Sequence, residues 1–483
     1  MSAQFASTTR RLRPASATWL ALALAWPAQA QGVTPALETL RGDLEVLLSD
    51  RNPSIRGEAA LALAATGDSK YHSAIREITR DRSRAARLKG IVALGVLGSP
   101  GAETVLGELL LAPGPPSPDR DAAALSLGLL PDSFPVPAIE RYFNRVDGGS
   151  YRKNHDTLSS MLVGLSLAPH PSRVPTLARL LDDAANRDPR VRRLAMLALA
   201  ANPDALPQIE TAEWLGSKHE DERLGALEAI EATGEDPGQE AIKLIGRTAR
   251  RDRSPRVRAA ALRVLTRLRH PDSLELSVVA IGSRHVEEVA AGVDTARRLG
   301  GGTIRMAMED QILHAKRADL QAAMLAEYDA SANPEFVTGC LRLAEDRRTA
   351  EAVRVQAASL AARSGERKSG GTIRELFAQA KDVANLRALA AAAHTLDPSL
   401  ISLDRVFPPT SGDDLRLLAA RTEALLAAGH PGAPDLLKEA LGSELLQTGT
   451  RAQLLRALRR VALGHLDAEV SRALPKALGA AIE

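Results

Sequence analysis

Residues 52–65 read NPSIRGEAALALAA, residues 188–201 read DPRVRRLAMLALAA, and residues 254–265 read SPRVRAAALRVL. Each stretch has a polar residue, then proline, then an arginine three residues later, with alanine three and leucine seven residues after the arginine. A polar side chain caps the exposed amides of a helix's first turn, and proline fits the first helical position because its missing N–H is not needed there. The three stretches therefore predict three nearly identical helices, each with a small apolar face.

The same arginine register recurs along most of the chain. Short steps between these arginines are 31 to 35 residues, and the longer steps of 72 and 96 residues divide into two units of 36 and three of 32. The register residues are Arg56, Arg87, Arg120, Arg192, Arg223, Arg258, Arg354 and Arg387. Degenerate units are expected near 155–168, 286–300 and 319–328, and two more helices near 413–428 and 450–463. Eight, three and two units make about thirteen, and a fixed period of this size predicts a solenoid.

Each repeated helix is followed by a turn signal and a second segment with an apolar stripe. Gly67, Gly98, Gly234 and Gly429 stand where a left-handed residue would end the first helix. The unit is therefore a helical hairpin, which must stack on its neighbours to bury its apolar face. Aromatic residues are only 3% of the chain, which also favours an all-α fold. We expect an α-solenoid over residues 31–483, forming an elongated arc of about 130 Å if thirteen hairpins stack at about one helix diameter each.

Two segments resemble a known repeat. Residues 48–63, LSDRNPSIRGEAALAL, and residues 251–265, RDRSPRVRAAALRVL, are similar to the pattern L-x-D-x-[DN]-P-x-[VI]-R-x-x-A-x-x-A-L of the HEAT-repeat family. The short period resembles the HEAT-like repeats of phycobilin lyases and many bacterial proteins. The resemblance implies a ladder of acidic residues and arginines between neighbouring helices. Asp50, Asp81 and Asp252 each lie six residues before a register arginine and fit that role, and the ladder should lapse around 289 and 320.

The first thirty residues differ from the rest. Arg10, Arg11 and Arg13 precede the short apolar run 17–26, and Ala28-Gln29-Ala30 supplies a small-x-small cleavage pattern. This arrangement predicts a secretory signal peptide over 1–30, with a mature start near Gln31 and export to the periplasm or the medium. The apolar run is too short for a transmembrane span, which needs about 20 residues.

The charge and the motifs of the remaining chain argue against several functions. The leader holds three arginines and no acidic residue, so its removal lowers the formal charge from +3 to 3 − 3 = 0. A nucleic-acid-binding protein would carry a surplus of Lys and Arg. The sequence contains no nucleophile elbow, Walker loop, HExxH or paired-cysteine motif, and the single cysteine, Cys340, is predicted to be a small buried residue. We therefore assign no catalytic, cofactor-binding or metal-binding residue and expect no cofactor.

One region stands out as a candidate contact surface. Residues 134–153 hold four aromatic residues, several cations and a Gly-Gly loop. Tyr142 and Phe143 fit the core stripe of a helix. Tyr151, Arg152 and Lys153 lie beyond the loop, and tyrosine beside arginine is typical of protein interfaces. We predict that these three residues contact a protein partner.

These observations favour an exported, non-catalytic scaffold or adaptor that binds another protein through a solenoid surface. The resemblance also allows an alternative, a HEAT-like lyase or enzyme-assembly chaperone related to bilin lyases. A third hypothesis is a cytosolic nucleic-acid-binding or regulatory protein. The partner and the oligomeric state stay open. Within the repeats, we expect Ala261 to face a neighbouring helix and Arg263 to lie on the exposed side.

Overall fold

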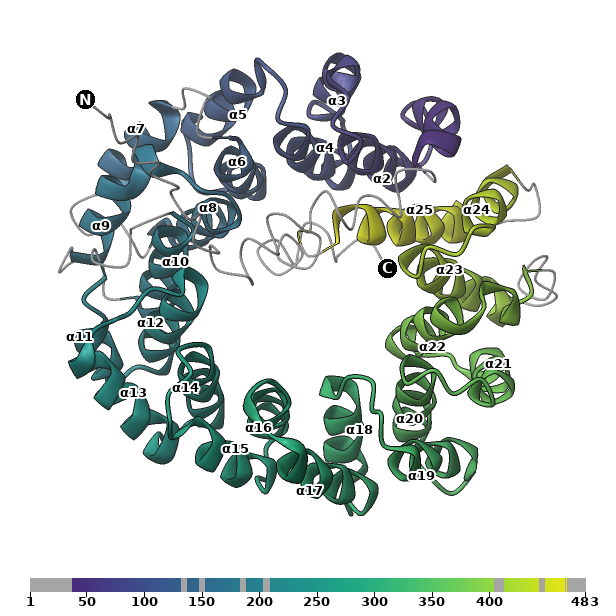
Figure 1. The fold of residues 1–483 in the computed structure, drawn as a ribbon. Coiled ribbons are helices and arrows are strands. Elements are labelled where there is room, and N and C mark those ends of the chain that lie inside the picture. The colour runs from purple at the N-terminus through teal and green to yellow at the C-terminus, as the bar shows by residue number, and fades with distance from the viewer. Residues whose placement is uncertain are drawn as a thin grey trace, which may run out of the picture.

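The computed structural model describes residues 37–131, 137–146, 153–182, 188–202, 209–403, 412–442, 448–464 and 466. All regular secondary structure in these ranges is helical. The chain forms an α-solenoid, as the sequence predicted, with its helices in two concentric layers (Figure 1). The predicted signal peptide, residues 1–30, lies outside the described residues, and so does its cleavage point.

The inner layer consists of one helix from each unit, and each packs on the next. Among the described residues it comprises α2 (Pro53–Ala64), α4 (Arg84–Leu97), α6 (Pro118–Leu129), α8 (His155–Leu167), α10 (Pro189–Ala200), α12 (Glu220–Thr233), α14 (Pro255–Arg267), α16 (Val286–Leu299), α18 (Ala318–Glu327), α20 (Glu351–Arg363), α22 (Val383–Leu396), α23 (Gly412–Ala427) and α25 (Thr448–Leu463). These thirteen helices match the thirteen predicted units, including the degenerate ones.

The outer layer covers the inner one on the convex side. A helix over residues 37–47 opens the described chain. It is followed by α3 (His72–Ile78), α5 (Ala102–Leu111), α7 (Pro137–Val146), α9 (Val174–Asp182), α11 (Thr211–Leu215), α13 (Gln239–Arg251), α15 (Ser273–Ile281), α17 (Gly302–Leu313), α19 (Pro334–Glu345), α21 (Ser369–Gln379) and α24 (Ala433–Gly442). Three short 3₁₀ turns, Ser69–Tyr71, Pro171–Arg173 and Pro398–Leu400, lie between helices of the described chain.

The solenoid closes into a ring. The last inner helix, α25, packs directly on the first, α2 (Figure 1). The expectation of an elongated arc was therefore wrong. Each hairpin turns by a small angle relative to its neighbour, and about 28° per unit brings thirteen units through a full circle. The period of the sequence reports the number of units, but it does not report this angle.

The helix starts and ends follow the predicted signals. The side chain of Asn52 accepts a hydrogen bond from the Ser54 amide at 2.8 Å, and that of Asp188 accepts one from the Arg190 amide at 2.9 Å. Ser254 caps α14 in the same way, through the Val257 amide at 3.4 Å. Capping residues thus fix where each repeated helix begins.

Small residues allow the inner helices to approach closely. Gly128 of α6 and Gly164 of α8 face each other, and a Cβ atom on Gly164 would lie 2.3 Å from the carbonyl oxygen of Leu125. Ala261 is completely buried, as predicted, whereas the Arg263 side chain is 38% exposed. The predicted phase of α14 is confirmed. Close packing of backbone on backbone makes the joint between α6 and α8 stiff.

Candidate functional site

Arginine–carboxylate pairs join neighbouring inner helices along one edge of the ring. The Arg56 guanidinium donates from Nε and Nη2 to both carboxylate oxygens of Asp81, at 2.7 and 2.9 Å. Arg87, in the same unit as Asp81, donates to the Asp81 carbonyl at 2.9 Å. One aspartate therefore connects two successive register arginines. This bidentate bond lowers the pKa of the Asp81 carboxyl group and raises the pKa of Arg56.

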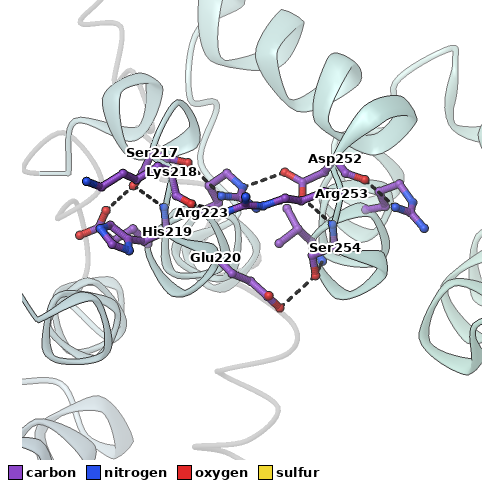
Figure 2. A network of polar contacts seen from close by, with 11 residues as sticks. Ser217, Lys218, His219, Glu220, Arg223, Asp252, Arg253 and Ser254 are labelled. Carbon is purple, nitrogen blue, oxygen red and sulfur yellow. Dashed lines mark hydrogen bonds and ion pairs between the residues drawn. The ribbon is translucent and has the colours of Figure 1, made fainter.

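The same arrangement recurs between α12 and α14, and Figure 2 shows it from close by. Arg223 donates to both oxygens of Asp252, at 2.7 and 3.0 Å, and to the Ser217 carbonyl at 2.9 Å. Asp252 also accepts from the Ser254 amide at 2.9 Å. Ser254 in turn donates its hydroxyl to Glu220 at 2.9 Å. These polar groups are used within the fold, so the network is structural.

The ladder uses two acceptor positions. Asp81 and Asp252 lie six residues before a register position, as expected, whereas the Asp50 carbonyl, and not its side chain, accepts from Arg56. A second group of acceptors lies directly before a register position and was missed by sequence reasoning. It comprises Asp119, Glu222 and Glu288, which bind Arg87, Arg192 and Arg258.

The ladder lapses where the sequence predicted. Val289 and Leu320 occupy the register positions of α16 and α18. A buried network takes over beyond this point, in which Glu309 accepts hydrogen bonds from Tyr328, Ser331 and Asn333 at 2.9, 2.6 and 2.6 Å. At this point of the ring, side-chain hydrogen bonds between residues 328–333 and α17 take the place of an arginine–carboxylate pair.

The seam that closes the ring contains a buried ion cluster. Glu58 of α2 is fully buried and accepts from Lys89 of α4 at 2.8 Å and from Arg459 of α25 at 2.8 Å. Arg456 of α25 contributes a third contact, at 3.4 Å. Gly57 makes room for this arrangement, because a Cβ atom there would lie 2.7 Å from Cδ of Lys89. A single carboxylate therefore joins both ends of the solenoid.

Burial and charge act in opposite directions on the Glu58 carboxyl group. Burial raises its pKa, but the positive charges of Arg459, Lys89 and Arg456 outweigh burial and hold the pKa below the ordinary value. Burial lowers the pKa of the Lys89 amine, and the attraction of Glu58 offsets this only in part. Glu58 is therefore ionised at neutral pH.

A groove on the outer face is lined by three exposed cations. It has a volume of about 490 Å³ and lies between α13 and the turn from α14 to α15. Lys243, Arg247 and Arg251 line it from α13, at spacings of four residues, with His270 and Asp272 on the opposite side. All three cations are exposed. We call these three residues the α13 stripe.

A second groove adjoins the first. It has a volume of about 210 Å³, lies between α13 and α15, and shares Arg250 with the first groove. Val279 of α15 lines it and is 69% exposed, and the neighbouring Val278 is 62% exposed. Arg250 itself is held by Asp272 at 2.7 Å. The outer face thus combines exposed cations with exposed apolar side chains.

The N-terminal units of the chain match a known repeat family. Residues 42–128 match the family model described as HEAT repeats. These residues are HEAT repeats. The resemblance that the sequence suggested is confirmed for this segment. The joint between Arg56 and Asp81, which lies inside it, recurs outside it at Arg223 and Asp252.

Several solved structures are similar to the chain at low identity. Human deoxyhypusine hydroxylase is 17% identical with a TM-score of 0.24, and the match covers 58% of this chain and 98% of that one. Kap121p bound to the SUMO protease Ulp1p is 15% identical with a TM-score of 0.32, covering 91% of this chain and 50% of that one. Importin beta is 13% identical with a TM-score of 0.33, covering 89% and 67%. The chain thus spans about half the length of Kap121p, and no curated protein sequence matches it.

The predicted contact residues are only partly described by the structure. Tyr151 and Arg152 lie outside the described residues. Lys153 is exposed and lies just before α8. Tyr142 and Phe143 are buried in α7, so the core interpretation of those two residues is confirmed. Burial raises the pKa of the Tyr142 hydroxyl to about 12.

Sequence signals for the other features existed but were ambiguous. Glu58 stands within the apolar stretch GEAALALAA, where an acidic residue is unusual. The α13 stripe is visible as cations at i, i+4 and i+8, a pattern that a solvated helix face also shows. Only the folded ring shows that Glu58 meets α25 and that the stripe borders a groove.

The part of the chain that the structure describes has neither a candidate membrane helix nor a metal-binding cluster. None of its helices combines the length and the apolar character that crossing a bilayer requires. Within the same residues, no group of three or more His, Cys, Asp or Glu side chains is arranged to hold a metal ion.

Proposed function

We propose that the protein is an exported, non-catalytic scaffold that binds another protein through the outer face of its ring. The observation that supports this most is that the chain itself supplies partners for some of its arginines and not for others. Along the ladder and at the seam, carboxylates or carbonyls of the chain bind the arginines. On the α13 stripe, Arg247 and Arg251 have no ion-pair partner among the described residues and face a groove. Cations left exposed beside a groove are available to a partner.

The form of the ring supports a scaffold role. Thirteen inner helices, packed in a closed cycle, hold the outer helices in fixed positions. A rigid surface loses little conformational entropy when a partner binds, which favours recognition without rearrangement. The predicted signal peptide supports the exported location, and N-terminal sequencing of the exported protein should give a start near Gln31. A start at Met1 would contradict export by this signal.

Site-specific photo-crosslinking tests protein binding. A photoreactive amino acid at position 247, in the groove, should crosslink one defined protein in the cells that make this chain. The same amino acid at position 108, where the exposed Glu108 lies on α5, is the control. The crosslinked protein must also bind the ring again when both are purified. If neither position 247 nor position 153 yields a crosslinked protein, the scaffold proposal is wrong.

The residues singled out by sequence remain a second proposed contact. Replacing Tyr151, Arg152 and Lys153 together by alanine should weaken capture of the partner at least tenfold, about 1.4 kcal/mol. The melting temperature should stay nearly unchanged. A large fall in melting temperature would show that these residues belong to the core instead.

A further inference from the structure

The α13 stripe has a regular geometry. Residues four apart on a helix lie on one face and about 6 Å apart along the axis, so Lys243, Arg247 and Arg251 form a row of about 12 Å. All three line the 490 Å³ groove. Gly246 lies in the same groove, and the nearest atom to a Cβ built there would be Nη1 of Arg250, at 3.7 Å. The row therefore borders open space, next to the Arg250 guanidinium of the same helix.

The charges in this part of the chain are unbalanced. Residues 241–270 contain ten Lys and Arg residues and one acidic residue, Asp252, whereas the whole chain has 62 and 59. Among the described residues, carboxylates outside this stretch pair with four of these cations, Arg250, Arg256, Arg258 and Arg263, and not with Arg247 or Arg251. Asp252 is already bound to Arg223. Lys243 has only a distant exposed contact, with Glu240 at 3.8 Å. The like charges of the stripe repel one another, and a bound anion would relieve that repulsion.

The neighbouring surface favours a protein as the source of the anion. Val278 and Val279, exposed on α15, can pack against apolar side chains of a peptide. Single-stranded nucleic acid is usually held by aromatic side chains that stack on its bases. No Phe, Trp or Tyr occurs between Trp214 and Tyr328. The groove and its surroundings thus provide positive charges and apolar side chains, and this stretch of the chain has no aromatic side chain on which a base could stack.

We propose that the α13 groove binds an extended acidic segment of a partner protein, with carboxylates at alternate positions. In an extended strand, alternate side chains lie on one side and about 6.6 to 6.8 Å apart, which matches the 6 Å steps of the stripe. Apolar side chains beyond the acidic stretch can reach Val279, which lines the adjoining groove. This inference rests on the proposed scaffold function and adds the chemistry of the partner.

Fluorescence anisotropy with a defined probe tests the inference. The probe is a labelled 12-residue peptide with glutamate at every second position and serine or valine between. It should bind the wild-type protein, and the double variant Arg247→Glu/Arg251→Glu should bind it at least tenfold more weakly. Affinity should also fall with added salt, because exposed charges are screened. A peptide with lysine in place of glutamate should not bind.

A matched control separates the groove from the overall charge. Arg348→Glu/Arg367→Glu changes the net charge equally at two exposed residues on another part of the ring and should alter binding less than twofold. Equal losses in both variants, or no binding by the wild type, would overturn the inference. Tighter binding of a 12-nucleotide oligothymidine, lost in the groove variant, would show a nucleic-acid site instead. If a partner crosslinks elsewhere on the ring while the peptide fails, the scaffold function stands and this inference does not.

Discussion

Two kinds of joint hold the ring together, and they differ in burial. In the ladder, Arg223 and Asp252 meet at the edge of adjacent inner helices, with 7% and 9% of their side chains exposed. At the seam, Glu58 and Lys89 are completely buried, and Arg459 is 2% exposed. The ladder joins units that follow each other in the chain. The seam joins residues 401 positions apart.

The difference shows where the closed shape is decided. A ladder joint stabilises the stacking of two hairpins whatever the overall curvature, so it would also exist in an open arc. The seam exists only if the ends meet. Removing one partner of a buried ion cluster is strongly destabilising, because the remaining charges stay buried without compensation. The ring should therefore depend on Glu58 far more than on any single ladder residue.

The largest effect is expected for Glu58→Ala. The change leaves Lys89, Arg456 and Arg459 without their shared carboxylate and should cost about 3–5 kcal/mol at the seam. Denaturant unfolding and small-angle scattering measure the cost and the opening of the ring. The control is Glu108→Ala, at an exposed position on α5. Equal stability of the two variants would contradict the role given to the seam.

Acid should open the ring in a defined window. The pKa of Glu58 and that of Asp81 are both lower in the folded protein than their ordinary values, because of the neighbouring cations. Their contribution is fully present above the unfolded pKa, about 4, and is lost as pH falls through the folded values. Their contribution should therefore be flat from pH 8 to 5 and be lost below about pH 4. Burial lowers the pKa of His430, so a separate loss is expected as pH falls below about 6.5. Absence of a further fall below about pH 4 would be inconsistent with the role of Glu58 and Asp81.

A smaller effect is expected for Asp252→Ala. Arg223 would lose its bidentate partner but keep the bond to the Ser217 carbonyl, and 7% of its side chain is exposed, compared with 0% for Glu58. The expected loss is about 1–2 kcal/mol. Asp310→Ala serves as the control, since Asp310 is 77% exposed. If Asp252→Ala destabilised the protein as much as Glu58→Ala, the distinction between the two joints would fail.

The smallest effect is expected for Arg263→Ala. Its ion pair with Glu231 spans 3.3 Å between side chains that are 38% and 23% exposed. Pairs of this kind contribute little, so thermal unfolding should show a change below about 0.5 kcal/mol. A loss above 1 kcal/mol would mean that exposed ion pairs between inner helices also stabilise the ring substantially.

The sequence predicted those features of the fold that depend on residues close together in the chain. Asn52 and Pro53 act within one unit and Arg56 acts between adjacent units, so their pattern predicted the helices and their number. The contact of Glu58 with Arg459 depends on the curvature summed over all units, which no local pattern reports. The same holds for the α13 groove, because Lys243 and His270 are brought together by the turn between α14 and α15.

The distance between α2 and α25 tests the closed ring most directly. Spin labels on cysteines placed at the exposed Arg51, before α2, and at Gln453, on α25, would report it. Cys340 is buried, and burial raises the pKa of its thiol to about 12, so it should not take the label. Neighbouring helices lie about 8–10 Å apart and α25 is about 24 Å long, so a closed ring predicts a narrow distance distribution below about 35 Å. A broad distribution centred beyond about 60 Å would show an open arc and contradict the account.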